Sequence, residues 1–114
     1  MTEVVVTDAF EDWYENLSDD DRDAVYRVVG LLEARGTTLP YPYSSAIQGS
    51  RIAMRELRIQ AGGKPLRVLY AFDPARQAVL LLGGDKTGDK RFYERLVPVA
   101  ERLFAEHLAS TRPG

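Results

Sequence analysis

The chain has 114 residues, of which 45% are hydrophobic and 28% are charged, a balance typical of one globular domain, here expected over 1–114. It has no cysteine and a single histidine, which excludes disulfide bonds, thiolate metal sites and multi-histidine metal centres, so we expect no cofactor. The net charge of -2 conceals two unlike halves, because residues 1–50 carry -7 and residues 51–114 carry +5, and the basic half suits a polyanion partner.

The N-terminal residues show neither the basic stretch nor the apolar core of a secretion signal. No apolar run approaches the length of about 18 residues that a transmembrane helix needs. We therefore expect a cytoplasmic protein with no membrane-bound part.

A short strand at Glu3–Val6 and two helices are predicted for the N-terminal half. Thr7 or Asp8 can cap the first helix, because their side-chain oxygens can accept hydrogen bonds from free amides. Its apolar face is formed by residues at helical spacing, namely Phe10, Trp13, Tyr14 and Leu17. Ser18 and the acidic run after it, which we interpret as solvated, begin the second helix, and Gly36 is well placed to end it.

A loop is expected at Thr37–Gly49, because its two prolines break helical hydrogen bonding, and Tyr41 and Tyr43 are expected to anchor it by packing. Three strands joined by short turns follow: Met54–Gln60, Pro65–Asp73 and Ala78–Gly83. The last of them is apolar at every position of Val79–Leu82, which is typical of a strand covered on both faces.

A C-terminal helix is predicted over Asp89–Leu108, where apolar residues recur at helical spacing. Pro98 should kink or divide this helix near Val97, and 110–114 is expected to be a frayed tail. The predicted fold is α+β with the order β-α-α-β-β-β-α. Its mainly antiparallel sheet carries the two N-terminal helices on one face, with a further helix at the C-terminus.

Side chains alternate between the two faces of a strand, so Arg58 and Arg67 are expected to emerge together on a face that the helices leave open. Lys86, just past the third strand, can come near them. Tyr93, one turn into the last helix, could stack on a base beside these cations. Other cations in or near the strands could contact RNA or only solvent: Arg55, Lys64, Lys90 and Arg91.

Simpler interpretations of the same residues also remain open. Glu56 could form a weak surface ion pair with Arg58 or Arg67. Tyr93 could be a half-buried packing residue. His107 is expected to be a solvated residue near the negative end of the last helix.

Three segments together resemble the RelE/ParE toxin superfamily, and within it the phage-derived branch that includes HigB-type toxins: Arg55-Glu56-Leu57-Arg58 after Gly49, Leu66-Arg67-Val68-Leu69-Tyr70-Ala71 after Gly63, and Leu80-Leu81-Leu82-Gly83-Gly84-Asp85-Lys86. The resemblance covers roughly Ala9 to Leu108. It implies a small RelE-like fold and a type II toxin–antitoxin toxin that is neutralised by a cognate antitoxin. A helix-turn-helix antitoxin would be usual for this branch.

The resemblance implies a metal-independent endoribonuclease that cleaves mRNA, usually on the ribosome, and thereby inhibits translation. ParE-like members share the fold but inhibit DNA gyrase, and a degenerate toxin that only binds its antitoxin is a third possibility. By position, the basic cluster would be Arg58, Arg67 and Lys86, with Tyr93 as the helix aromatic. The branch often carries Lys-Lys-Thr where this chain has Asp85-Lys86-Thr87, so one lysine is replaced by an acid.

Such an enzyme must deprotonate the ribose 2′-OH, stabilise the phosphorane and protonate the leaving oxygen. Arginine suits the second task because its planar fork matches phosphate oxygens. We therefore expect Arg58 and Arg67 to clamp the phosphate, Lys86 to act as base or electrostatic stabiliser, and Tyr93 to orient the base or the 2′-OH.

Overall fold

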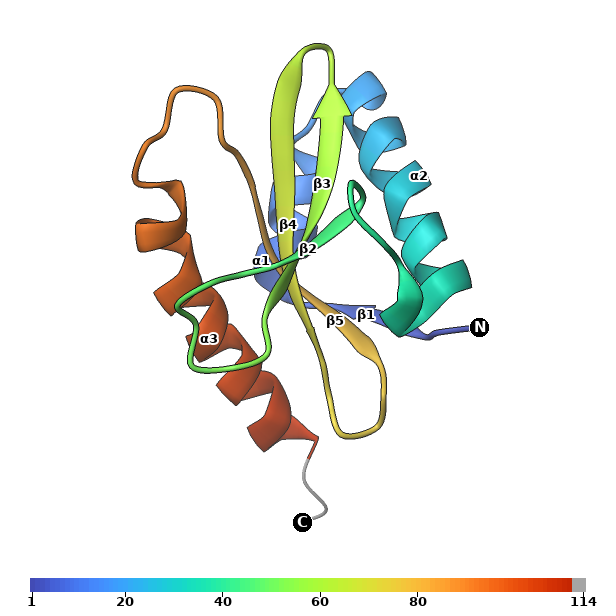
Figure 1. Ribbon diagram of the computed structural model, residues 1–114, viewed down its shortest axis with the longest axis vertical. Coiled ribbons are helices and arrows are strands. Elements are labelled where there is room, and N and C mark those ends of the chain that lie inside the picture. The colour runs from blue at the N-terminus through green and yellow to red at the C-terminus, as the bar shows by residue number, and fades with distance from the viewer. Residues whose placement is uncertain (112–114) are drawn as a thin grey trace.

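A computed structural model describes residues 1–111 of the chain as an α+β fold, as predicted. The mixed sheet has the strand order β1-β5-β4-β3-β2, in which β1 runs parallel to β5 and the other neighbours are antiparallel (Figure 1). In chain order the elements are β1 (Val4–Val6), α1 (Asp8–Glu15), α2 (Asp19–Arg35), η1 (Gly36–Thr38), β2 (Ser44–Ala46), β3 (Arg55–Ala61), β4 (Lys64–Phe72), β5 (Ala78–Asp85) and α3 (Phe92–Ser110).

The predicted helix boundaries of the N-terminal half are confirmed by their capping bonds. Thr7 Oγ1 accepts a hydrogen bond from the Phe10 amide at 3.0 Å and starts α1. Ser18 Oγ accepts from the Asp21 amide at 3.2 Å and starts α2. Gly36 ends α2 with a φ of 55°, a left-handed value that glycine adopts without strain.

The segment predicted as a loop contains more structure than expected. It holds the 3-10 turn η1 and the strand β2, whose Ser44 pairs with Leu57 and whose Ala46 pairs with Arg55. Tyr41 and Tyr43 are 68% and 43% exposed, so the expectation that they anchor the loop by packing is wrong.

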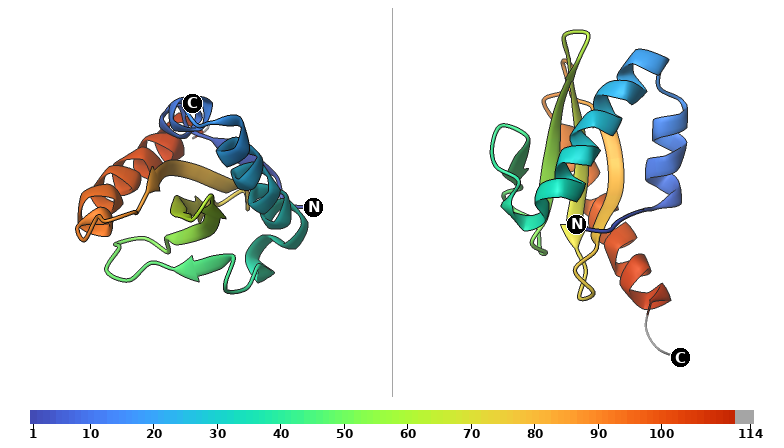
Figure 2. Two further views of the ribbon diagram at one scale, coloured as in Figure 1. Left: turned by 90° about the horizontal axis from the view of Figure 1, so that it is seen from above. Right: turned by 90° about the vertical axis from the view of Figure 1, so that its right-hand side faces the viewer.

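The sheet is covered on both faces, which corrects the expectation of an open face. One face packs under α1 and α2 through Leu57, Val68 and Tyr70, among others. The other face packs under α3, whose Ala100 and Phe104 meet apolar residues of the middle strands (Figure 2). The prediction that the last strand is covered on both faces is therefore confirmed. Leu80 packs in the core under α1 and α2, whereas Val79 and Leu81 pack in the core under α3.

The C-terminal helix α3 is continuous from Phe92 to Ser110, so Pro98 lies inside it without dividing it. His107 is not solvated as expected, because its Nε2 lies 2.9 Å from Oδ2 of the buried Asp73 at the end of β4. Most of the predicted tail, 112–114, lies outside the described residues. Within 1–111, no helix is both long and apolar enough to cross a membrane.

Candidate functional site

Four of the predicted site residues lie together around the carboxylate of Glu56, for which the sequence indicates no more than a weak surface ion pair. Arg58 on β3 pairs directly with Arg67 on β4, so their side chains share a face of the sheet. Glu56 lies two residues before Arg58 and shares that face too. Lys86 follows β5, and Tyr93 stands in the first turn of α3. We call these five residues the Glu56 cluster.

Glu56 is only 5% exposed, and its carboxylate makes all the central contacts of the cluster. Oε1 accepts a hydrogen bond from the Tyr93 hydroxyl at 2.5 Å and lies 3.5 Å from Arg67 Nε. Oε2 lies 3.6 Å from Arg58 Nη1. The Glu56–Arg67 pair is therefore buried, whereas Arg58 pairs with the same carboxylate from a partly exposed position. The carboxylate thus joins both arginines and the phenol in one set of contacts.

The Tyr93 ring links Lys86 to the rest of the cluster. The Lys86 ammonium lies 5.4 Å from the centroid of this ring, within the range of a cation–π contact. The Lys86 amide donates to the Pro65 carbonyl at 2.9 Å, which holds the start of the loop against β4. Burial and the hydrogen bond to Glu56 raise the pKa of Tyr93, so the phenol keeps its proton at neutral pH.

The cations differ in their access to solvent. Arg67 is 5% exposed, donates to the Leu66 carbonyl at 3.0 Å, and has a buried Nε with no hydrogen-bond partner among residues 1–111. The Arg58 side chain is 30% exposed, and its guanidinium carbon lies 5.2 Å from the centroid of the exposed Tyr41 ring. Lys86 is half-buried, so an anion arriving from solvent meets Arg58 and Lys86 first, with Arg67 behind them.

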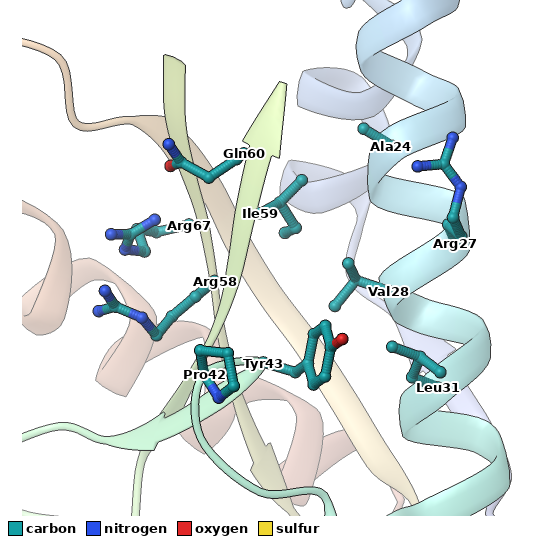
Figure 3. A pocket seen from close by; sticks show the side chains of 10 residues that line it. All are labelled: Ala24, Arg27, Val28, Leu31, Pro42, Tyr43, Arg58, Ile59, Gln60 and Arg67. Atoms are coloured by element: carbon teal, nitrogen blue, oxygen red, sulfur yellow. The ribbon is translucent and has the colours of Figure 1, made fainter. Parts of the chain in front are cut away.

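A groove of about 500 Å³ opens beside the cluster and crosses the free edge of β3 (Figure 3). Figure 3 shows the Tyr43 ring facing Val28 and Leu31 of α2, while Arg58 and Arg67 project to the other side of β3. We call it the α2–β3 groove. Its lining residues are Ala24, Arg27, Val28, Leu31, Pro42, Tyr43, Arg58, Ile59, Gln60 and Arg67.

The other cations considered for RNA contact lie apart from the Glu56 cluster in varied settings. Arg55 faces the α1–α2 side of the sheet, where its Nε donates to Ser44 Oγ at 3.0 Å. Lys64 pairs with Asp21 at the start of α2, and this hydrogen bond raises the lysine's pKa. The exposed pair Arg91 and Glu94 lies 3.5 Å apart at the start of α3, and the neighbouring Lys90 is exposed. Whether any of the four cations contacts RNA stays a prediction.

The acid that replaces a lysine of the resembling family is used inside its own loop. Asp85 Oδ1 accepts hydrogen bonds from the Thr87 hydroxyl at 2.6 Å and from the Thr87 amide at 2.9 Å. These bonds lower the pKa of Asp85. The carboxylate therefore shapes the loop that carries Lys86.

Sequence reasoning missed Glu56 as the centre of the site, although its strand parity with Arg58 was a usable signal. The contact between Tyr41 and Arg58 was not predicted either, because the sequence of a proline-rich loop does not indicate which strand the loop will lie against. In the described part of the chain, no three His, Cys, Asp or Glu side chains gather in a way that could hold a metal ion.

Comparisons with known proteins agree on one family. The sequence profile of the family described as "Phage derived protein Gp49-like (DUF891)" matches residues 12–105. The chain is 41% identical over 113 residues to a Mycobacterium tuberculosis protein named "Putative toxin HigB3", and the alignment covers 97% of each chain. It is 38% identical over 100 residues to "Putative toxin HigB2" of the same organism, covering 85% of this chain and 50% of that relative.

Proposed function

Because this chain belongs to the Gp49-like family of phage-derived proteins, whose relatives include proteins named as HigB toxins, we propose that it is the toxin of a toxin–antitoxin module. In this proposal it acts in the cytoplasm as a metal-independent mRNA endoribonuclease. The observation that carries the catalytic part is the Glu56 cluster. It supplies three cations, a phenol and a carboxylate within one connected set of contacts.

The proposed reaction is attack of the ribose 2′-oxygen on the adjacent phosphorus. The P–O5′ bond breaks, which leaves a 2′,3′-cyclic phosphate on one fragment and a 5′-hydroxyl on the other. The 2′-hydroxyl loses a proton and the leaving 5′-oxygen gains one, so the protein needs one acceptor, one donor and cations for the phosphorane.

Arg58 and Lys86 are the cations placed to meet the phosphate, because their side chains reach solvent. Arginine's planar fork suits the equatorial phosphate oxygens, and the Lys86 ammonium can protonate the leaving oxygen. Arg67 is buried behind them, where its positive charge adds to the field at the phosphate and pairs with Glu56.

Tyr93 and Glu56 together offer a path for the proton of the 2′-hydroxyl. As the phenol oxygen takes that proton, its own proton passes along the 2.5 Å hydrogen bond to Glu56 Oε1. The raised pKa of Tyr93 keeps the phenol protonated before and after the transfer. Exchange with solvent then removes the proton that Glu56 gained and returns one to Lys86, which restores both groups for the next cycle.

The proposed partners are mRNA, free or bound on the ribosome, and a cognate antitoxin of the helix-turn-helix type. The antitoxin is expected to cover either the Glu56 cluster or the acid-rich helices α1 and α2. Binding governed by these charges should weaken as salt is added.

Induction in a bacterial host tests this function against the two alternatives. We expect the wild type to stop growth with an immediate fall in the incorporation of labelled amino acid, and Arg58→Ala to lose this effect. Growth arrest with translation intact and a DNA damage response would instead indicate gyrase inhibition. A harmless wild type would indicate a toxin that only binds its antitoxin.

A further inference from the structure

We propose that the α2–β3 groove binds the nucleotide next to the cut bond, with its phosphate at the arginine end and its base at the apolar end. The inference rests on the proposed ribonuclease function and adds a substrate subsite to it. It assigns the selection of RNA sequence to residues outside the Glu56 cluster.

The charge of the groove suits an anion. Its lining includes Arg27, Arg58 and Arg67 but no aspartate or glutamate. Arg58 and Arg67 also belong to the Glu56 cluster, so the groove continues directly from the place where the reacting phosphate would lie. A strand of RNA that leaves the cluster toward α2 therefore enters the groove.

The other end of the groove has the character of a base-binding slot. Tyr43 is 43% exposed, and its ring faces the aliphatic side chains of Val28 and Leu31 (Figure 3). An aromatic ring opposite an aliphatic wall holds a flat base by stacking and burial, as proteins that read single-stranded RNA do. The volume of about 500 Å³ lies within the range of small-ligand sites, about 300–1,000 Å³.

The floor of the groove is the free edge of β3, and it exposes one residue able to read a base. The Arg58 amide points outward and donates to the backbone carbonyl of Tyr43 at 2.8 Å. Backbone groups of an antiparallel strand alternate in direction, so the Gln60 amide and carbonyl also point outward. The pairing of β2 ends at Leu57, so it does not reach Gln60.

This short edge favours RNA over a docked peptide strand. An added β-strand needs a row of outward backbone groups, whereas the polar edge of a single base needs one donor and one acceptor. Gln60 supplies both from its backbone, and its exposed side-chain amide can supply them again.

The test is to map the 5′ ends of mRNA fragments after brief induction of the wild type and of two groove variants. Tyr43→Ala removes the stacking ring, and Arg27→Ala removes the outer cation. Tyr26→Ala and Arg35→Ala are matched controls, since both residues are exposed on α2 but do not line the groove. Thermal unfolding of each purified variant confirms that it is folded.

We expect the wild type to prefer certain bases at a position flanking the cut. Tyr43→Ala should reduce that preference by about fivefold or more, as loss of base stacking predicts. Arg27→Ala should lower the yield of cuts, and both controls should match the wild type.

Each other outcome overturns the inference. Unchanged cut profiles in both variants, or a wild type without base preference at either flanking position, would refute the subsite while leaving the ribonuclease intact. Variants that cut normally but escape a co-expressed antitoxin would assign the groove to a protein partner. A wild type that arrests growth without cutting RNA would instead refute the proposed function itself.

Discussion

The Tyr93 hydroxyl is the smallest group on which the proposed chemistry depends. Tyr93→Phe keeps the ring beneath Lys86 but removes the donor to Glu56. We expect the rate of RNA cleavage at saturating substrate to fall by about 10²-fold or more, as for the loss of an acid–base group. Rapid-quench assays of the wild type and of Tyr93→Phe provide the measurement.

Tyr26→Phe is the control for this substitution, because it removes a hydroxyl from a tyrosine that is 73% exposed. If Tyr93→Phe changes only the apparent affinity for RNA, the phenol binds substrate and does not move its proton. A rate equal to that of the wild type would remove Tyr93 from the mechanism.

The sequence predicted which residues share a face of a strand better than which residues they contact across the fold. Strand parity correctly placed Arg58 and Arg67 on one face, because alternation is a property of any strand. It could not place Glu56 beneath Tyr93, since that contact joins residues 37 positions apart and exists only once α3 covers the sheet. His107 was misjudged for the same reason, because its partner Asp73 lies 34 positions away.

The packing of α1 on β5 depends on a glycine. A Cβ at Gly83 would collide with the Trp13 indole ring, which lies directly on the strand backbone. Gly83→Ala should therefore lower the free energy of unfolding by about 1–3 kcal/mol, the usual cost of overpacking. Urea denaturation gives this value directly.

Gly30→Ala is the matched control, because a Cβ there meets nothing within 4 Å and the residue lies within α2. Alanine's higher helix propensity should raise the free energy of unfolding by about 0.5–1 kcal/mol. Equal effects of the two substitutions would contradict the close approach of Trp13 to β5.

The end of α3 is joined to the β4–β5 turn by the pair of His107 and Asp73. Burial acts to raise the pKa of Asp73, but hydrogen bonds from His107 and Gln77 outweigh it and lower the pKa below the ordinary 3.8. A carboxyl with a lower pKa in the folded state stabilises the fold above its unfolded pKa. That contribution is lost as the pH falls through the folded value.

We expect Asp73→Asn to flatten the loss of stability on acidification, because the titrating group is gone. His107→Ala should cost about 1–3 kcal/mol at neutral pH by leaving the buried carboxylate without one partner. Urea unfolding of both variants from neutral to acidic pH checks this. An acid profile of Asp73→Asn that matches the wild type would show that Asp73 does not contribute.

Elements with strong local signals were predictable, and those that depend on neighbours were not. The caps at Thr7 and Ser18 and the glycine turn at Gly62 and Gly63 act through their own few residues. The strand β2 has only three residues, Ser44–Ala46, and exists because β3 offers it an edge. No pattern within such a segment separates it from a loop.

Across the whole molecule, the acidic and basic parts of the sequence lie on different sides of the sheet. The strongly acidic residues 1–50 supply α1 and α2, which cover one face of the sheet (Figures 1 and 2). The Glu56 cluster lies on the other face, toward α3. The charge division was visible in the sequence. The side of the sheet on which each charged half lies could not be predicted, because it depends on which face each helix covers.

Cleavage of mRNA by the Glu56 cluster can be measured in a cell-free translation extract. Purified wild-type protein, Lys86→Ala and the control Arg102→Ala would be added with an end-labelled mRNA, and the fragments would be analysed for their termini. Arg102 is a suitable control because it is an exposed cation on α3 outside the cluster.

We expect the wild type and Arg102→Ala to produce fragments with 5′-hydroxyl and 2′,3′-cyclic phosphate ends at the same rapid rate. Lys86→Ala should form them at least about tenfold more slowly, since a cation that stabilises the transition state is missing. Intact mRNA with the wild type would show that the protein does not cleave mRNA, and cleavage by Lys86→Ala at the wild-type rate would show that Lys86 takes no part in the reaction.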